Sequence, residues 1–257
     1  MVTLNSAALD LVLHQLYVHF PVPGGLVRAV DGVDICFRHQ QITGIIGESG
    51  CGKSTLASIL MGRNKGYTGS VSVGGVPLSS IQEESLLRNI TYISHQSYLF
   101  KGTVRESLQM GDDRAGDEAL WRVLERVRLA DFLRAEKGLD TPLTENAGNL
   151  SGGWQRRCSI AMALISEPKI LFLDEPTLGL DVLARSELWD LIKELKGKVT
   201  VILTTHYMEE AEALADRVGI MKSGRLITVG TPAEIKEEAG TEKFEDAFIT
   251  LVKGAKK

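Results

Sequence analysis

The sequence has little cysteine, no long apolar run and no excess of positive charge. Cys36, Cys51 and Cys158 are too few and too scattered for a disulfide framework or a zinc site, and they fit a reducing, intracellular compartment. No stretch approaches the roughly 20 apolar residues that cross a bilayer, and the N-terminus lacks the basic start and apolar core of a signal peptide. The net charge of -4 argues against a nucleic-acid partner. Any role at a membrane is therefore expected to depend on partner proteins.

What the chain does contain is an alternation of short apolar runs and helical patterns. Buried strands are expected at 42–46, 90–94, 169–173 and 199–204. Helices are expected at 53–61, over most of 104–135, and at 151–165 and 183–195. Earlier strands occupy 9–37 around a turn at 21–25, and a hairpin pairs 218–221 with 225–229. This order predicts an α/β fold with a mainly parallel sheet.

The domain organisation follows from the same alternation. Residues 1–257 are expected to form one unit whose core comprises about 9–96 and 166–235 and includes an antiparallel β subdomain. A helical subdomain is expected as an insertion at about 97–165. A charged helical tail is expected at about 236–257.

The segment between the strand at 42–46 and the next helix matches the phosphate-binding pattern G-x-x-x-x-G-K-[ST]. It consists of Gly47, Glu48, Ser49, Gly50, Cys51, Gly52, Lys53, Ser54 and Thr55. Glycines let the backbone curl so that several N–H groups point at one phosphate, at a helix N-terminus that favours negative charge. Lys53 is predicted to reach the β- and γ-phosphates, and the Ser54 hydroxyl to bind Mg²⁺. The pattern in this context predicts a P-loop NTPase core.

Cys51 is not needed for phosphate chemistry. We interpret it as a small residue that fits the loop. The alternative is that the helix N-terminus lowers its pKa and makes the thiol reactive.

Two acids follow the apolar strand at 169–173. Asp174 and Glu175 are expected at the carboxyl edge of the sheet, beside the phosphate loop, because open α/β sheets bind ligands there. Asp174 is predicted to hold Mg²⁺. Glu175 is then free to orient or deprotonate the attacking water.

The sequence Leu150-Ser151-Gly152-Gly153 stands one helix before this acid pair. LSGG followed by a helix and then an LDEPT strand end resembles the ATP-binding cassette of ABC proteins. The resemblance implies that Ser151, Gly152 and Gly153 bind the γ-phosphate of an ATP held by a second cassette, in a head-to-tail dimer. A hydroxyl and bare amides at a helix N-terminus suit such an anion.

The remaining family positions are assigned by resemblance alone. Gln96 matches the glutamine that touches Mg²⁺, Asp181 matches the loop that contacts the other cassette, and His206 matches the histidine that contacts the γ-phosphate. Phe20 matches the aromatic that stacks on adenine, with Tyr17 as the competing candidate. Together with Lys53 and Glu175, His206 is predicted to be catalytic.

The chain departs from the family pattern at two positions. Trp154 stands where the family usually has glutamine, and Met162 stands where arginine is common. Both substitutions put the strength of the cross-dimer contacts in doubt. Neither removes a hydroxyl or amide expected to face phosphate.

The resemblance implies an ATPase, with ATP and Mg²⁺ as ligands, that powers integral membrane permease subunits from the cytoplasmic face of the cell membrane. Residues 97–103, with Tyr98 and Phe100, are the expected contact with those subunits. The segment 204–235 and the tail are similar to drug and polysaccharide exporters, which favours export. Residues 16–33 are similar to peptide importers, so a peptide or nickel-type importer is the alternative. A soluble ABC ATPase without transport, such as a translation factor, also remains open.

Overall fold

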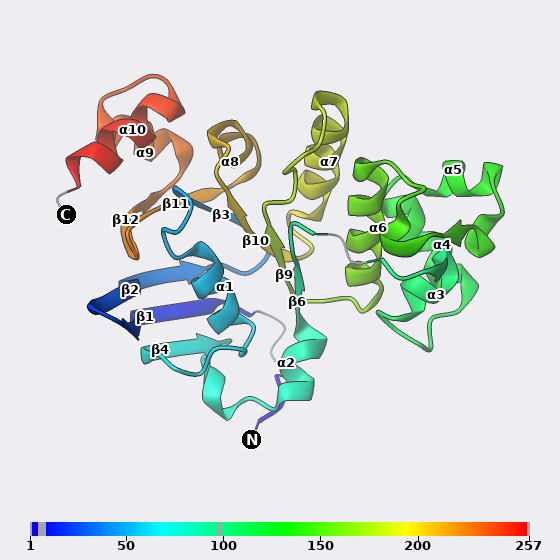
Figure 1. Cartoon of the computed structure of the whole chain (residues 1–257), viewed down its shortest axis with the longest axis horizontal. Coiled ribbons are helices and arrows are strands. Elements are labelled where there is room, and N and C mark those ends of the chain that lie inside the picture. The colour runs from blue at the N-terminus through cyan, green and yellow to red at the C-terminus, as the bar shows by residue number, and fades with distance from the viewer. Residues whose placement is uncertain (1, 5–8, 97–98, 256–257) are drawn as a thin grey trace.

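The computed structural model describes residues 2–4, 9–96 and 99–255, and a six-stranded sheet runs through its middle (Figure 1). The strand order is β12-β11-β3-β10-β9-β6. These strands are β3 (Ile42–Ile46), β6 (Ile90–Ile93), β9 (Ile170–Asp174), β10 (Thr200–Thr205), β11 (Arg217–Lys222) and β12 (Arg225–Gly230). Neighbours from β11 to β6 pair in parallel, and only β12 runs antiparallel.

The central strands are unbroken apolar runs in the sequence because both of their faces are buried. Every residue of β3, β9 and β10 is buried, as expected for strands covered on both faces. Their parallel register brings Ile46, Thr205 and Asp174 to the same edge of the sheet. The predicted α/β fold with a mainly parallel sheet is therefore confirmed.

A second sheet is antiparallel and contains four strands in the order β2-β1-β4-β5. Its strands are β1 (Leu11–Val22), β2 (Gly25–Phe37), β4 (Thr68–Val73) and β5 (Val76–Pro77). Helix α1 (Lys53–Leu60) shares one apolar cluster with residues of both sheets, including Phe37, Leu56 and Phe172. Sequence reasoning did not predict β4 or α2 (Glu83–Asn89), which complete this side of the molecule.

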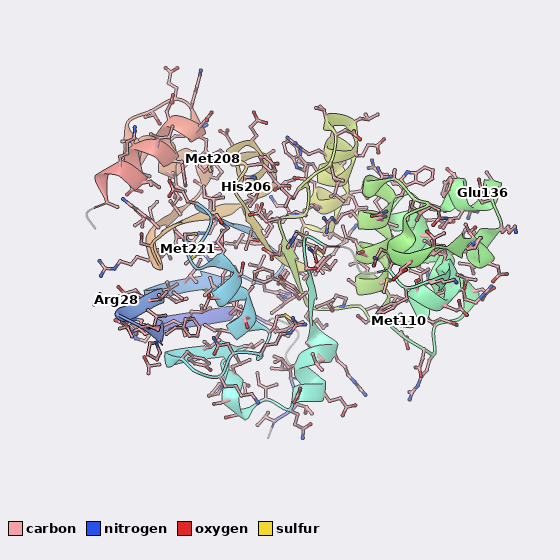
Figure 2. The ribbon with its side chains drawn as sticks, viewed as in Figure 1. Arg28, Met110, Glu136, His206, Met208 and Met221 are labelled. Atoms are coloured by element: carbon pink, nitrogen blue, oxygen red, sulfur yellow. The ribbon has the colours of Figure 1, made fainter. Side chains whose placement is uncertain are left out.

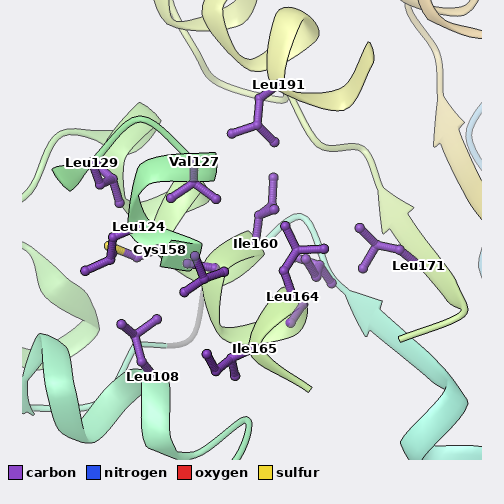
Figure 3. Close-up of a cluster of buried hydrophobic side chains, with 14 of the residues drawn as sticks. Leu108, Leu124, Val127, Leu129, Cys158, Ile160, Leu164, Ile165, Leu171 and Leu191 are labelled. Atoms are coloured by element: carbon purple, nitrogen blue, oxygen red, sulfur yellow. The ribbon is translucent and has the colours of Figure 1, made fainter. Parts of the chain in front are cut away.

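A group of helices lies at the opposite end of Figure 1 from the C-terminus. It contains α3 (Val104–Gln109), α4 (Asp117–Arg126), α5 (Ala130–Ala135), α6 (Gly152–Ile165), the short strands β7 (Gly102–Thr103) and β8 (Pro142–Leu143), and the 3-10 turns at Gly138–Asp140 and Glu145–Ala147. Figure 3 shows their shared core, in which Leu108, Leu124, Ile160 and Leu164 gather beside Leu171 of β9. Cys158 lies in this core, and burial raises the pKa of its thiol to about 12.

The last helices lie along one side of the sheet, from a position beside the helical group to the end that carries the C-terminus (Figure 1). They are α7 (Val182–Leu195), α8 (Met208–Leu214), α9 (Pro232–Ala239) and α10 (Phe244–Gly254). The tail was expected to be charged, yet Phe244, Phe248 and Val252 are buried against Ile220 and Ile235. Helix α10 is thus amphipathic, with an apolar face that joins the core. Among the described residues, no helix has the length and apolar character to span a membrane.

Candidate nucleotide site

A cleft of about 1190 Å³ opens where β3, β9 and β10 end. The phosphate loop forms one side of it, from Ser49 to Thr55. Asp174, Glu175 and His206 reach it from the ends of β9 and β10. Phe20 of β1 and residues of the β11–β12 turn line its mouth. The carboxyl edge of the sheet therefore carries the cleft, as expected for an open α/β fold.

The phosphate loop is shaped by close backbone contacts. Gly52 has a φ of 107°, and a Cβ atom there would lie 2.1 Å from the Ala29 carbonyl oxygen. A Cβ atom on Gly47 would lie 2.4 Å from the carbonyl oxygen of Met221, which is labelled in Figure 2. Lys53 Nζ donates hydrogen bonds to the carbonyl oxygens of Gly47 (2.6 Å) and Glu48 (3.2 Å). The glycines are thus required by geometry, and the Lys53 ammonium lies within the loop that it would share with phosphate.

The environment of Cys51 agrees with the interpretation of a small residue that fits the loop, and it contradicts the alternative of an activated thiol. Cys51 is buried, and its carbonyl oxygen accepts a hydrogen bond of 3.0 Å from the Gly224 N–H. Burial raises the pKa of the thiol, and the nearby Lys53 ammonium opposes this effect without reversing it. Cys51 is therefore a packed small residue of the loop.

Asp174 is held by two hydroxyl groups that sequence reasoning missed. Its carboxylate accepts hydrogen bonds from Tyr92 (2.7 Å) and from Thr204. Thr204 is the register partner of Asp174 on β10, and Tyr92 lies on β6, the other neighbour of β9. Burial raises the pKa of Tyr92, and its bond to Asp174 raises it further, so the phenol stays protonated and donates. These contacts fix the direction of the carboxylate.

The donor groups fit Mg²⁺ rather than a softer metal. Asp174 and the exposed Ser54 line the same cleft and offer oxygen atoms, which Mg²⁺ prefers. The described part of the chain contains no group of three or more His, Cys, Asp or Glu side chains placed to hold a metal ion by themselves. Mg²⁺ in nucleotide sites usually has only a few ligands from the protein, and substrate phosphates supply others. Gln96 does not line this cleft but lies in an adjoining hollow.

Glu175 and His206 meet at the far side of the cleft. A hydrogen bond of 2.5 Å joins His206 Nδ1 to Glu175 Oε2, and Figure 2 shows His206 beyond the end of β10. Glu175 has a φ of 49°, which is uncommon for a residue with a side chain. Its N–H donates to the carbonyl oxygen of Thr204 (3.0 Å), which holds this turn against β10. The pair is partly open to the cleft, with His206 43% exposed and Glu175 17% exposed.

The signature residues lie outside this cleft. Ser151 caps α6, and its Oγ accepts a hydrogen bond of 3.4 Å from the Trp154 N–H. Gly152 lines the adjoining hollow of about 390 Å³ together with Gln96. Asp181 caps α7 and accepts a hydrogen bond of 2.9 Å from the Ala184 N–H. One chain therefore brings together the phosphate loop, Asp174, Glu175, His206 and Phe20, but not Ser151–Gly153 or Asp181.

The two departures from the family pattern are explained by packing. The Trp154 ring lies on Phe132 of α5, with ring centroids 3.5 Å apart. Met162 is half-buried and packs against the helical core. Trp154 thus attaches the start of α6 to α5, while the Ser151 hydroxyl stays exposed at the helix end.

Phe20 and Tyr17 differ in where their rings lie. Phe20 is 43% exposed and lines the mouth of the cleft. The Tyr17 hydroxyl donates to Gln15 Oε1 (2.9 Å), and its ring lies edge-on to His19. Tyr17 is not among the residues that line the cleft. Of the two, Phe20 is placed to meet a base.

These features define a P-loop nucleotide-binding protein, since a glycine-rich loop joins β3 to α1 beside an acid at the end of a buried parallel strand. The family model described as ABC transporter matches residues 30–178. The chain therefore belongs to the ABC transporter family, as an ATP-binding domain.

Individual relatives agree with this assignment. The chain is 36% identical over 212 residues to an uncharacterized ABC transporter ATP-binding protein of Haemophilus influenzae, and the match covers 82% of this chain and 38% of that protein. It is 35% identical to the daunorubicin resistance ATP-binding protein DrrA3 of Streptomyces coeruleorubidus, covering 85% of this chain and 68% of that one. A bacterial Atm1-family ABC exporter solved with ATP bound superposes with a TM-score of 0.85 at 22% identity, over 99% of this chain and 43% of that chain. This last likeness shows the fold.

Replacing each candidate aromatic separately tests the adenine contact. Phe20→Ala should weaken ATP binding by about 5- to 150-fold in Kd, because base–aromatic stacking contributes roughly 1–3 kcal/mol. Tyr17→Ala should leave the Kd within about threefold, since Tyr17 is not among the residues that line the cleft. Fluorescent-nucleotide titration measures both. A larger loss of ATP affinity in Tyr17→Ala than in Phe20→Ala would assign the adenine contact to Tyr17.

Proposed function

We propose that the chain is the ATPase of an ABC transporter, that it works as one of two cassettes, and that it powers integral membrane permease subunits. The observation that carries this proposal is the Glu175–His206 contact of 2.5 Å facing the phosphate loop. A general base beside a phosphate cradle is what hydrolysis requires and what simple nucleotide storage does not.

ATP is the proposed substrate. Its phosphates would receive hydrogen bonds from the loop N–H groups and from the Lys53 ammonium, and its adenine would lie on Phe20. Ser54 and Asp174, with Gln96 from the adjoining hollow, would hold Mg²⁺, which neutralises phosphate charge in such sites. Tyr92 and Thr204 would keep Asp174 in place.

Hydrolysis is proposed to follow an in-line path. A water oxygen forms a bond to the γ-phosphorus, and the bond to the β–γ bridging oxygen breaks, which yields ADP and phosphate. Glu175 orients the water and accepts its proton. His206 holds the Glu175 carboxylate and faces the γ-phosphate position.

The second half of each site is proposed to come from another cassette. Ser151–Gly153 and Asp181 lie outside the chain's own cleft, at helix starts that offer a hydroxyl and backbone N–H groups. Nearby, Val182 and Leu183 are 81% and 71% exposed, although both are large and apolar. A head-to-tail partner cassette would place its ATP against Ser151–Gly153 and Asp181, and it would cover Val182 and Leu183. Coupling to transport is then a population shift, in which permease subunits favour one state when the cassettes are closed.

Export is the proposed direction, at the cytoplasmic face of the cell membrane. One relative is named for daunorubicin resistance, which supports export. Phe100 is 57% exposed and Met110 59% exposed, so apolar side chains near the expected permease contact are available. The predicted contact residue Tyr98 lies outside the described residues.

Glu175→Gln should lower ATP turnover by about 10²–10⁴-fold, the usual contribution of a positioned acid–base group. ATP binding should persist because Lys53 and the loop are intact, so the variant should accumulate as an ATP-bound dimer. Phosphate release and size-exclusion chromatography with ATP measure the two effects. Turnover near that of the wild type would refute the role of Glu175.

Cells that express the neighbouring permease genes test the partner. The chain should then sediment with membranes and co-purify with an integral membrane protein, because the described helices cannot span a bilayer. Phe100→Asp should weaken this association, since it places a charge in the proposed apolar contact. A chain found on ribosomes and absent from membranes would support a translation factor instead.

A further inference from the structure

Beneath the Glu175–His206 pair lies a buried carboxyl group that the proposed mechanism does not use. Glu210 of α8 is fully buried. Its Oε1 accepts hydrogen bonds from the Thr177 hydroxyl (2.8 Å) and from Trp189 Nε1 (3.2 Å). A carboxyl group that is taken out of water needs such donors to be tolerated.

Buried threonines flank both members of the proposed catalytic pair. Thr177 follows Glu175 by two residues, and Thr205 directly precedes His206. Both threonines are fully buried. The Thr205 hydroxyl also accepts a hydrogen bond of 3.0 Å from the Tyr207 N–H, which fixes the turn that carries His206. The Thr177–Glu210 hydrogen bond therefore joins the segment after Glu175 to α8, the helix that begins two residues after His206.

The surroundings show that Glu210 is not half of an ordinary ion pair. Among the described residues it forms no ion pair, and its Oε2 has no hydrogen-bond partner. Burial raises the pKa of Glu210 and the Glu175 charge raises it further, whereas hydrogen bonds from Thr205, Thr177 and Trp189 lower it. The Glu210 charge acts on the guanidinium of the buried Arg156, but that guanidinium donates instead to the carbonyl oxygens of Ser94 (2.7 Å) and His95. Solubility or surface pairing cannot explain a carboxyl group in this position.

We infer that Glu210 is a positioning residue for the proposed hydrolysis. Its carboxyl oxygen ties the segment after Glu175 to α8, which begins two residues after His206, at the spacing that lets the two side chains meet. The inference rests on the proposed function only in calling this pair catalytic. The strained φ of 49° at Glu175 shows why support is needed, because a residue in this region persists only when its surroundings hold it there.

Two substitutions of Glu210 test whether its hydrogen-bond acceptor, and not only its side-chain volume, positions the pair. Glu210→Gln keeps a carbonyl oxygen for Thr177 and Trp189, and it resembles the neutral acid in shape. Glu210→Ala removes the acceptor and leaves several buried donors without a partner. Leu214→Ala is the matched control, because Leu214 is also buried on α8 but its side chain has no polar atom that could bond to Thr177 or Trp189.

The readout that does not depend on activity is the NMR spectrum of the full chain with ¹⁵N-labelled histidine. The His206 ring signals are assigned by their loss in His206→Gln, and Glu175→Gln shows where they move when the 2.5 Å contact is broken. Glu210→Ala should shift them toward the Glu175→Gln position. Glu210→Gln and Leu214→Ala should leave them unchanged.

The kinetic readout is a split between turnover and binding. Glu210→Ala should lower kcat by about 10- to 100-fold, as misplacement of a catalytic group does, while the Kd for ATP stays within about threefold. Glu210→Gln should restore kcat to within about threefold of the wild type. Leu214→Ala should lower Tm and leave kcat within about twofold.

The outcomes are distinguishable. Unshifted His206 signals in a folded Glu210→Ala variant would overturn the inference, and so would equal effects of Glu210→Ala and Leu214→Ala on every readout. If Glu210→Ala does not fold, Thr177→Val removes the donor that joins the two segments, and unshifted His206 signals in that variant would overturn the inference equally. A wild-type chain that hydrolyses no ATP, but whose His206 signals respond as expected, would refute the proposed function and support the positioning role.

Discussion

The structure depends on the close stacking of three backbone segments around the phosphate loop. The carbonyl oxygen of Ala29 on β2 lies close to Gly52, that of Met221 on β11 lies close to Gly47, and that of Arg28 lies close to Gly224. A Cβ atom on any of these three glycines would clash with the neighbouring carbonyl oxygen. These contacts tie the antiparallel sheet and the β11–β12 hairpin to one loop. The loop N–H groups can therefore form a preorganised anion site without help from a ligand.

The same edge of the sheet then determines which groups share the cleft. Because β3, β9 and β10 are parallel and in register, the loop, the Asp174–Glu175 acids and His206 follow three neighbouring strand ends. Side chains of Tyr92 on β6 and Thr204 on β10 hold Asp174 from outside the cleft, and Glu210 of α8 bonds to Thr177, two residues after Glu175. The signature residues follow no strand end of this sheet, and they lie elsewhere. This separation is the physical reason for proposing that two chains complete each site.

Local signals allowed much of this to be predicted from the sequence. Uninterrupted apolar runs gave β3 and β9 nearly to the residue, and the glycine-rich loop gave the start of α1 at Lys53. The polar, glycine-containing strand β4 and the short helix α2 carry weak local signals, because they are stabilised by contacts with distant strands. Cys51 was open to two interpretations since burial, which decides its pKa, depends on the β11–β12 turn.

The residues that hold the site residues in place could not be predicted in the same way. Tyr92 is 82 residues from Asp174, and Glu210 is 33 residues from Thr177. Their roles depend on strand order and on the packing of α8, which no local pattern encodes. The charged composition of the tail likewise concealed the apolar face of α10, because Phe244, Phe248 and Val252 are spaced along one side of the helix.

The central claim is that each ATP lies between two chains, and mixing two damaged chains tests it most directly. Lys53→Ala removes the loop cation and Ser151→Arg obstructs the signature, so each homodimer should be inactive. Random pairing makes about half of the dimers mixed, and each mixed dimer has one intact site, so mixing should restore at most about a quarter of wild-type ATPase activity. Absence of recovery at every ratio, with mixed dimers shown to form and unable to trap ATP between chains, would contradict the shared site.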